Sequence, residues 1–263
     1  VGAVRWVEEA GVKVPKALAI TGNSFASDIA IVGSGGNIQL NAVGGLVQLK
    51  NTSGDNAIST ISGGIQLNSG KGNSALQSVS GNISVKNYYG DLIAKTLSGN
   101  IDLVGDVFFD THLNAASGNI TIYFYNTENI TLSANTLSGK LSAHFNDKPM
   151  GQLKLKAGVM GNIHNNLSRD QVEVSALGVK SFLMGRKNRN SHIVLSTLNG
   201  DIVVEKAVLD LQGLDGRKGG EELASGIVKP EKQTQWLLGG GKATEVFYPV
   251  GSQEHNLAVE VYL

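Results

Sequence analysis

The chain has 263 residues, of which 41% are hydrophobic, 17% are charged and 34 are glycine. This hydrophobic content excludes a disordered chain, because disorder requires low hydrophobicity together with a high net charge. Lysine plus arginine and aspartate plus glutamate each number 22, so the net charge is zero. Without a basic excess, we expect no nucleic-acid partner.

Cysteine is absent, which excludes disulfide bonds, thiolate catalysis and cysteine-based metal sites. No run of 18 apolar residues occurs, so we expect no transmembrane segment. Residues 1–10 include Arg5, Glu8 and Glu9, so no signal peptide is visible in this chain.

Residues 1–21 lack the repeat that dominates the rest of the chain, and they contain Trp6 and Pro15. We predict that they form an N-terminal cap on a stack of repeats. Such a stack requires a cap, because an uncovered end exposes unpaired strand edges and invites aggregation.

A motif of eight residues recurs from residue 60 onward. Its eight positions are, in order, a small residue; an apolar residue; Ser; Gly; Asn or Asp; Ile or Leu; any residue; and an aliphatic residue. Copies of the motif start at Thr60, Ser78, Thr96, Ala115, Thr136 and Thr197. The Ile or Leu positions from Ile65 to Leu141 follow at intervals of 18, 18, 19 and 21 residues. Imperfect versions occupy residues 36–40 and 45–49. The aliphatic alternation predicts a short strand and the Ser-Gly-Asn unit a turn, where glycine allows a positive φ or a close backbone approach.

A second, weaker aliphatic series lies between these motifs, so each repeat is predicted to hold two short strands. Its members are Ile58, Leu76, Leu92, Leu113 and Ile130.

The same residue at the same phase of each repeat predicts a β-solenoid over residues 22–212, with coils of about 18–20 residues. Coils stacked about 4.8 Å apart place equivalent residues above one another, and stacked Ser and Asn side chains can then hydrogen-bond from coil to coil. The predicted serine stack is Ser62, Ser80, Ser98, Ser117 and Ser138. We expect a dry, narrow interior filled by aliphatic side chains. The alternative fold is a β-sandwich whose regularity is accidental.

The repeat loosens over residues 146–190, where 152–156 and 171–174 are still typical of strands and a looped insertion is predicted around 182–190. Residues 213–263 belong to the same domain. The Gly-rich stretch 213–241 is predicted to be a long surface loop, either a binding loop or a variable insertion. Residues 255–263 are predicted to be a strand that pairs with the last coil or with a neighbouring molecule.

No strong catalytic motif is present. There is no Gly-x-Ser-x-Gly elbow, and stacking explains the recurring Ser-Gly pairs. The five histidines lack metal-ligand spacing and the calcium repeat Gly-Gly-x-Gly-x-Asp does not occur, so we expect no catalytic residue, no metal site and no cofactor. An alternative is a polysaccharide-cleaving β-helix, whose acid and base would come from charged residues on an outer sheet. The candidates are Glu173, Asp201, Glu205, Lys206 and the basic run at 186–189.

Clustered aromatic and basic residues are the candidates for contact with a glycan or another surface. Tyr123 and Tyr125 share one face of a predicted strand and Phe124 the other, so some of these rings are expected to be exposed. The basic run could meet phosphate or an acidic glycan. The candidate contact residues are Tyr88, Tyr89, Tyr123, Tyr125, Arg186, Lys187 and Arg189.

The segments 80–85, 98–103 and 199–204 resemble the Ser-Gly-Asn/Asp-Ile repeats of a bacterial family described as adhesins, a domain of otherwise unknown function. The likeness covers roughly residues 36–145 and 190–206. It implies a right-handed, single-stranded β-helix that is exported, so that the expected location is extracellular or on the cell surface. It brings no catalytic residues with it.

Three functional hypotheses follow. The first is a non-enzymatic adhesin or structural scaffold, and the second is a protein that binds or cleaves polysaccharide. The third is a subunit of an extracellular fibre, in which residues 1–10 or 257–263 pair with the next molecule by strand addition. The expected partners are therefore a glycan or cell-surface component, or a second copy joined through the ends of the solenoid.

Overall fold

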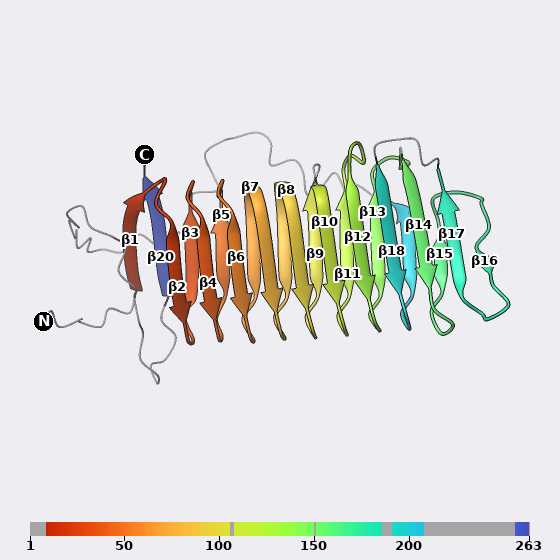
Figure 1. The fold of residues 1–263 in the computed structure, drawn as a ribbon, viewed down its shortest axis with the longest axis horizontal. Helices are drawn as coiled ribbons and strands as arrows, with labels where there is room; N and C mark the ends of the chain where they lie inside the picture. The colour runs from red at the N-terminus through yellow and green to blue at the C-terminus, as the bar shows by residue number, and fades with distance from the viewer. Residues whose placement is uncertain (1–8, 106–107, 150, 186–190, 208–255, 263) are drawn as a thin grey trace, which may run out of the picture. The chain divides into compact units, whose positions relative to one another are not determined.

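The computed structural model describes residues 9–105, 108–149, 151–185, 191–207 and 256–262. Its regular elements are strands, which lie side by side in two rows (Figure 1). Two long strands, β7 (Ile65–Ser78) and β8 (Ile83–Thr96), run through both rows and join them. The fold is therefore all-β and is the predicted β-solenoid. Within the described part of the chain, no helix is long and apolar enough to span a membrane.

The first row continues on either side of β7 and β8. In spatial order it contains β2 (Ile20–Ser24), β4 (Ile38–Ala42), β6 (Asn56–Thr60), β7, β8, β10 (Phe108–Ala115), β12 (Thr131–Thr136), β18 (His192–Thr197), β14 (Gln152–Ala157), β17 (Lys180–Met184) and β16 (Glu173–Val174). Its pairs are parallel except β14–β17 and β16–β17, which are antiparallel.

The second row is parallel throughout. In spatial order it contains β1 (Glu9–Pro15), β20 (Asn256–Tyr262), β3 (Asp28–Val32), β5 (Val47–Lys50), β7, β8, β9 (Ile101–Gly105), β11 (Ile120–Phe124), β13 (Leu141–Phe145), β19 (Ile202–Lys206) and β15 (Ile163–Asn165).

The predicted stacking of the main aliphatic series is confirmed. Ile65 lies opposite Ile83, which lies opposite Ile101, and the series continues through Ile120 to Leu141. All five side chains have an exposed fraction of 0%. The alternation of buried and exposed residues along each strand places them inside the solenoid.

Two expectations for the interior need correction. The second aliphatic series does not stack at Leu92. This residue is buried, but it lies opposite Ser74 and Thr111, whereas Ala94 lies opposite Leu76. The interior is also not purely aliphatic. It contains the stacked rings of Phe124 and Phe145, whose centroids are 4.7 Å apart, and buried hydroxyl groups at the corners.

The first-row strands β4, β6, β7, β8, β10, β12 and β18 end at a corner built from the repeat motif, here called the glycine corner. The corner reads Ser-Gly after β6, β7, β8, β10 and β12, Gly-Gly after β4 and Asn-Gly after β18. A Cβ atom added at Gly99, Gly118 or Gly139 would lie 2.0, 1.6 or 1.8 Å from the carbonyl oxygen of the equivalent glycine in the preceding coil. A close approach of two backbones therefore requires glycine at these three corners.

Polar side chains connect neighbouring coils at the same corners. The Thr96 hydroxyl accepts a hydrogen bond from the Gly99 N–H at 2.9 Å and donates one to the Gly81 carbonyl at 3.3 Å. Asn100 Oδ1 accepts the N–H of Asn119 in the next coil at 2.9 Å. The predicted coil-to-coil bonding of asparagine is confirmed, and these bonds satisfy polar groups that the corners bury.

The order of the strands in space departs from their order in the chain at both ends of the stack. β18 and β19 lie between the pair β12 and β13 and the pair β14 and β15 (Figure 1). Likewise, β20 pairs with β1 on one edge and β3 on the other. In each case a later segment of the chain lies between strands that come earlier in the sequence, and it pairs with both of them.

These insertions correct the predicted ends. The terminal strand pairs with the first coils, not with the last coil or with another molecule, because β20 has a partner on both edges. The looped insertion predicted around 182–190 is wrong at its start, since Phe182 is buried in β17, and residues 186–190 lie outside the described residues. The glycine-rich stretch 213–241 lies outside the described residues.

Candidate functional site

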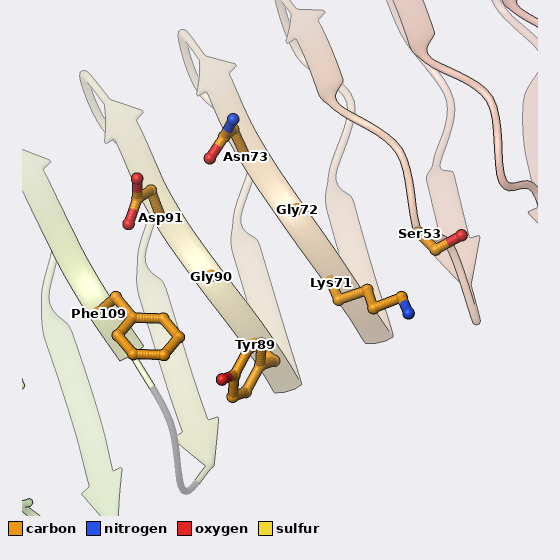
Figure 2. A pocket seen from close by; sticks show the side chains of 8 residues that line it. All are labelled: Ser53, Lys71, Gly72, Asn73, Tyr89, Gly90, Asp91 and Phe109. Atoms are coloured by element: carbon orange, nitrogen blue, oxygen red, sulfur yellow. The ribbon is translucent and has the colours of Figure 1, made fainter. Parts of the chain in front are cut away.

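A surface hollow among the described residues lies beside β7, β8 and β10, at the bend that leads into the first row. Its volume is about 390 Å³. Figure 2 shows Tyr89 and Phe109 side by side on neighbouring strands, with Asp91 and Asn73 farther along β8 and β7. The two rings meet edge to face, with centroids 4.8 Å apart and an angle of 89° between their planes. Both rings remain accessible, with exposed fractions of 52% for Tyr89 and 38% for Phe109.

The coil register brings these residues together. In the pairing of β7 with β8, Lys71 lies opposite Tyr89 and Asn73 lies opposite Asp91. Gly72 and Gly90 lie opposite each other between them, with φ values of 119° and 139° that favour glycine. The two glycines let both strands turn through the bend without breaking the ladder, so the flanking side chains project as a fixed set.

Hydrogen bonds hold the polar members in place. Asp91 Oδ1 accepts the N–H of Asp110 at 3.3 Å, and the backbone N–H of Asn73 donates to Asp55 Oδ1 at 3.1 Å. A second hollow of about 490 Å³ shares Asn73 and Asp91 with the first and continues across the outer surface of β2, β4, β6, β7 and β8. Together the two hollows make a long, open surface that has exposed aromatic rings at one end and amide and carboxylate groups along it.

A family model described as Toastrack DUF4097 matches residues 11–205, which is most of the chain and contains this whole surface. The chain belongs to the Toastrack DUF4097 family. No curated protein and no solved structure matches it. The Toastrack family description names no activity and does not carry the adhesin role.

Tyr88 corrects the predicted contact set, because it is an interior residue of the Toastrack fold. Its exposed fraction is 1%, and its hydroxyl accepts a hydrogen bond from Ser74 at 2.9 Å. Burial raises the pKa of this phenol. A side chain enclosed in this way cannot contact a glycan.

The remaining predicted contact residues are dispersed. Tyr123 and Tyr125 are exposed and Phe124 is buried, which confirms the predicted alternation. The ring of Tyr123 stacks on His144 in the next coil, at a centroid distance of 4.3 Å, and does not line the hollow that contains Tyr89. Arg186, Lys187 and Arg189 lie outside the described residues.

Of the residues that line the hollow, the sequence interpretation named Tyr89 and missed Phe109, Asn73, Asp91 and Lys71; Phe109 is the aromatic one among those missed. It follows Phe108 directly, as Tyr89 follows Tyr88, and the two aromatic doublets are one coil apart. The second aromatic doublet is the signal that could have found it. The coil period alone does not align the two doublets, because the register places Phe108 opposite Gly90 and shifts before Thr111.

The carboxylates considered for polysaccharide cleavage lie in different parts of the described structure, and the basic run at 186–189 lies outside it. Glu173 lies in β16 at the end of the first row, whereas Asp201 directly precedes β19 and Glu205 lies near the end of that strand. About 13 Å of extended backbone lies between Asp201 and Glu205. Each also has a structural partner, since Asp201 Oδ1 accepts the N–H of Asn162 at 2.8 Å and Glu205 Oε1 lies 3.2 Å from His144 Nδ1.

His144 makes the stability of this Toastrack protein depend on pH. Burial lowers its pKa, against the opposing effect of the nearby Glu205 carboxylate. The unfolded chain therefore binds a proton at His144 more readily than the folded chain does, so stability falls as the pH drops below about 6.5. We expect the melting temperature of His144→Gln to decline less than that of the wild type between pH 7.5 and pH 5. Equal declines measured by circular dichroism would contradict this prediction.

Proposed function

We propose that this Toastrack protein is a non-enzymatic binding scaffold, extracellular or on the cell surface, that holds a glycan on the Tyr89–Phe109 surface. The observation that carries the proposal is the exposed aromatic pair at one end of a long surface that also presents amide and carboxylate groups. Aromatic faces pack against the C–H faces of sugar rings, and amides and carboxylates hydrogen-bond their hydroxyl groups. An adhesin or an anchored scaffold would use such a surface to hold a polymer without changing it.

The shape of the surface supports an extended ligand. The two hollows share Asn73 and Asp91, so a ligand lying along them would meet several coils in succession. The ladder of backbone hydrogen bonds fixes the spacing of those coils at about 4.8 Å. A rigid, preformed surface loses little conformational entropy on binding, which favours affinity. The ligand class we propose is therefore a polysaccharide, held at several successive sugar residues.

Co-sedimentation with a panel of insoluble polysaccharides, together with affinity electrophoresis on soluble ones, tests the proposal. We expect the wild type to bind at least one polymer and Tyr89→Ala and Phe109→Ala each to weaken that binding by about tenfold or more, as loss of a central aromatic contact does elsewhere. Tyr125→Ala is the matched control, because Tyr125 is an exposed tyrosine outside both hollows.

The same samples are assayed for new reducing ends. Their release by the wild type would replace the binding scaffold with a polysaccharide-cleaving enzyme. Binding that Tyr125→Ala weakens as much as Tyr89→Ala, or the absence of binding to every polymer, would refute the glycan site.

A further inference from the structure

A line of apolar side chains runs along the glycine corners, at the other bend of the coil from the aromatic hollow. We call Val43, Ile61, Val79, Leu97, Leu137 and Leu198 the apolar ridge. They occupy the apolar position of the repeat motif, directly before its serine or the residue that replaces it. Backbone hydrogen bonds set their alignment, since the N–H of Ile61 donates to the Ala42 carbonyl, and the equivalent bond repeats up to Leu198. Ala116 occupies the same position between Leu97 and Leu137.

The ridge faces solvent. The exposed fractions of Ile61, Leu97, Leu137 and Leu198 are 53%, 56%, 52% and 53%, while those of Val43 and Val79 are 37% and 43%. The residue just before each of them is buried and is a small polar residue or alanine, so the solenoid interior does not use the ridge. A polar side chain could occupy each position at no cost to the core, and yet the apolar type recurs in coil after coil.

The ridge is long and carries no charge. Its six apolar side chains are each between 37% and 56% exposed, and contiguous exposed apolar patches often mark interaction surfaces. The residue that follows each ridge position is serine, glycine or asparagine and carries no charge. The net charge of the chain is zero, so two copies do not repel each other over long range.

We propose that the ridge is a self-association surface on which two copies of this chain pack side by side. The argument for a second copy is the repeat itself. Ridge residues recur about every 4.8 Å over about 29 Å, and another ridge has the same spacing, so its side chains can fit between those of the first along the full length. Such a contact uses the same patch on both copies, as a two-fold dimer does. This surface lies along the side of the solenoid, whereas self-association through its ends was expected from the sequence.

Sedimentation velocity over a concentration series tests the proposal. We expect the full chain to reach twice its mass of 27.6 kDa at micromolar concentrations, and Leu97→Glu combined with Leu137→Glu to stay at the monomer mass. Tyr89→Glu combined with Phe109→Glu is the matched control, because it places the same charges on exposed positions at the other bend. A wild type that is monomeric throughout, or a dimer that both double variants disrupt equally, would overturn the proposal.

The absence of cysteine allows a direct check of geometry. Single cysteines introduced by Ile61→Cys, Leu97→Cys or Leu137→Cys can form a disulfide only with another copy. We expect crosslinking at one or more of these positions and none for Lys86→Cys, on an exposed residue of β8 away from the ridge. Crosslinking at all three would indicate parallel copies, and crosslinking only near Leu97 antiparallel ones. Equal crosslinking at Lys86, or none on the ridge, would contradict the interface.

Discussion

Gly118→Ala is expected to lower the free energy of unfolding by about 3 kcal/mol or more, at the upper end of the cost of overpacking. The added Cβ would lie 1.6 Å from the Gly99 carbonyl oxygen. The obstructing atom belongs to the backbone, so no side-chain rotation can relieve the clash. Neighbouring coils would have to separate, which strains the nearby bond from the Ser117 N–H to the Leu97 carbonyl. Urea denaturation followed by circular dichroism measures the change.

Gly44→Ala is the matched control for this prediction. Gly44 also lies at a glycine corner, but a Cβ there would meet its nearest atoms at 3.5 and 3.7 Å, which is ordinary van der Waals contact. We expect its effect on the free energy of unfolding to stay within about 0.5 kcal/mol. If the two variants were equally destabilised, close coil contact would not be the reason for glycine at Gly118.

Ile101→Ala should cost about 2–5 kcal/mol, the range measured when a buried aliphatic side chain is truncated. Ile101 has an exposed fraction of 0% and lies between Ile83 and Ile120 in the interior stack. The interior is narrow and its walls are hydrogen-bonded ladders, so they can collapse only slightly into the cavity. The cost is therefore expected toward the upper part of that range.

Asp102→Ala provides the comparison for Ile101→Ala. Asp102 follows Ile101 on β9 but projects from the outer face, where it is exposed. Its removal should change the free energy of unfolding by less than about 0.5 kcal/mol. A small loss for Ile101→Ala in the same thermal and urea experiments would contradict the stacked interior.

The repeat motif predicted the solenoid because stacking imposes a phase. A residue that always meets its own equivalent in the next coil is selected for the same contact, so Ile65, Ile83 and Ile101 appear at equal spacing and lie in one stack. The same argument predicted which side chains face the interior. It needed only the period of the repeat and the alternation of aliphatic residues along each strand.

The candidate site was harder to predict because the alternation changes phase within β8. Lys86 and Asn87 are both exposed in succession, and Asn87 has a φ of 51°. That left-handed residue shifts the faces by one position, which turns Tyr88 inward and Tyr89 outward. The sequence interpretation took both rings of the doublet as contact candidates, because the phase change that buries Tyr88 depends on a single backbone angle.

The inserted strands could not be predicted for a different reason. Every strand in the second row offers the same parallel ladder and the same aliphatic pattern, so the motif at 197–204 fits equally well at several levels of the stack. Its place between β13 and β15 depends on which neighbours the completed chain leaves unpaired. Local residue patterns carry no information about such long-range competition.

The position of β20 has a consequence for how the protein is made. During synthesis, β1 and β3 leave the ribosome more than two hundred residues before the strand that fills the space between them. The first level of the second row therefore stays unfinished until translation has passed residue 262, and a polypeptide arrested before that point presents two open strand edges. Closure of the first coil is in this way linked to the synthesis of β20, and an arrested product differs from the folded protein by its exposed strand edges.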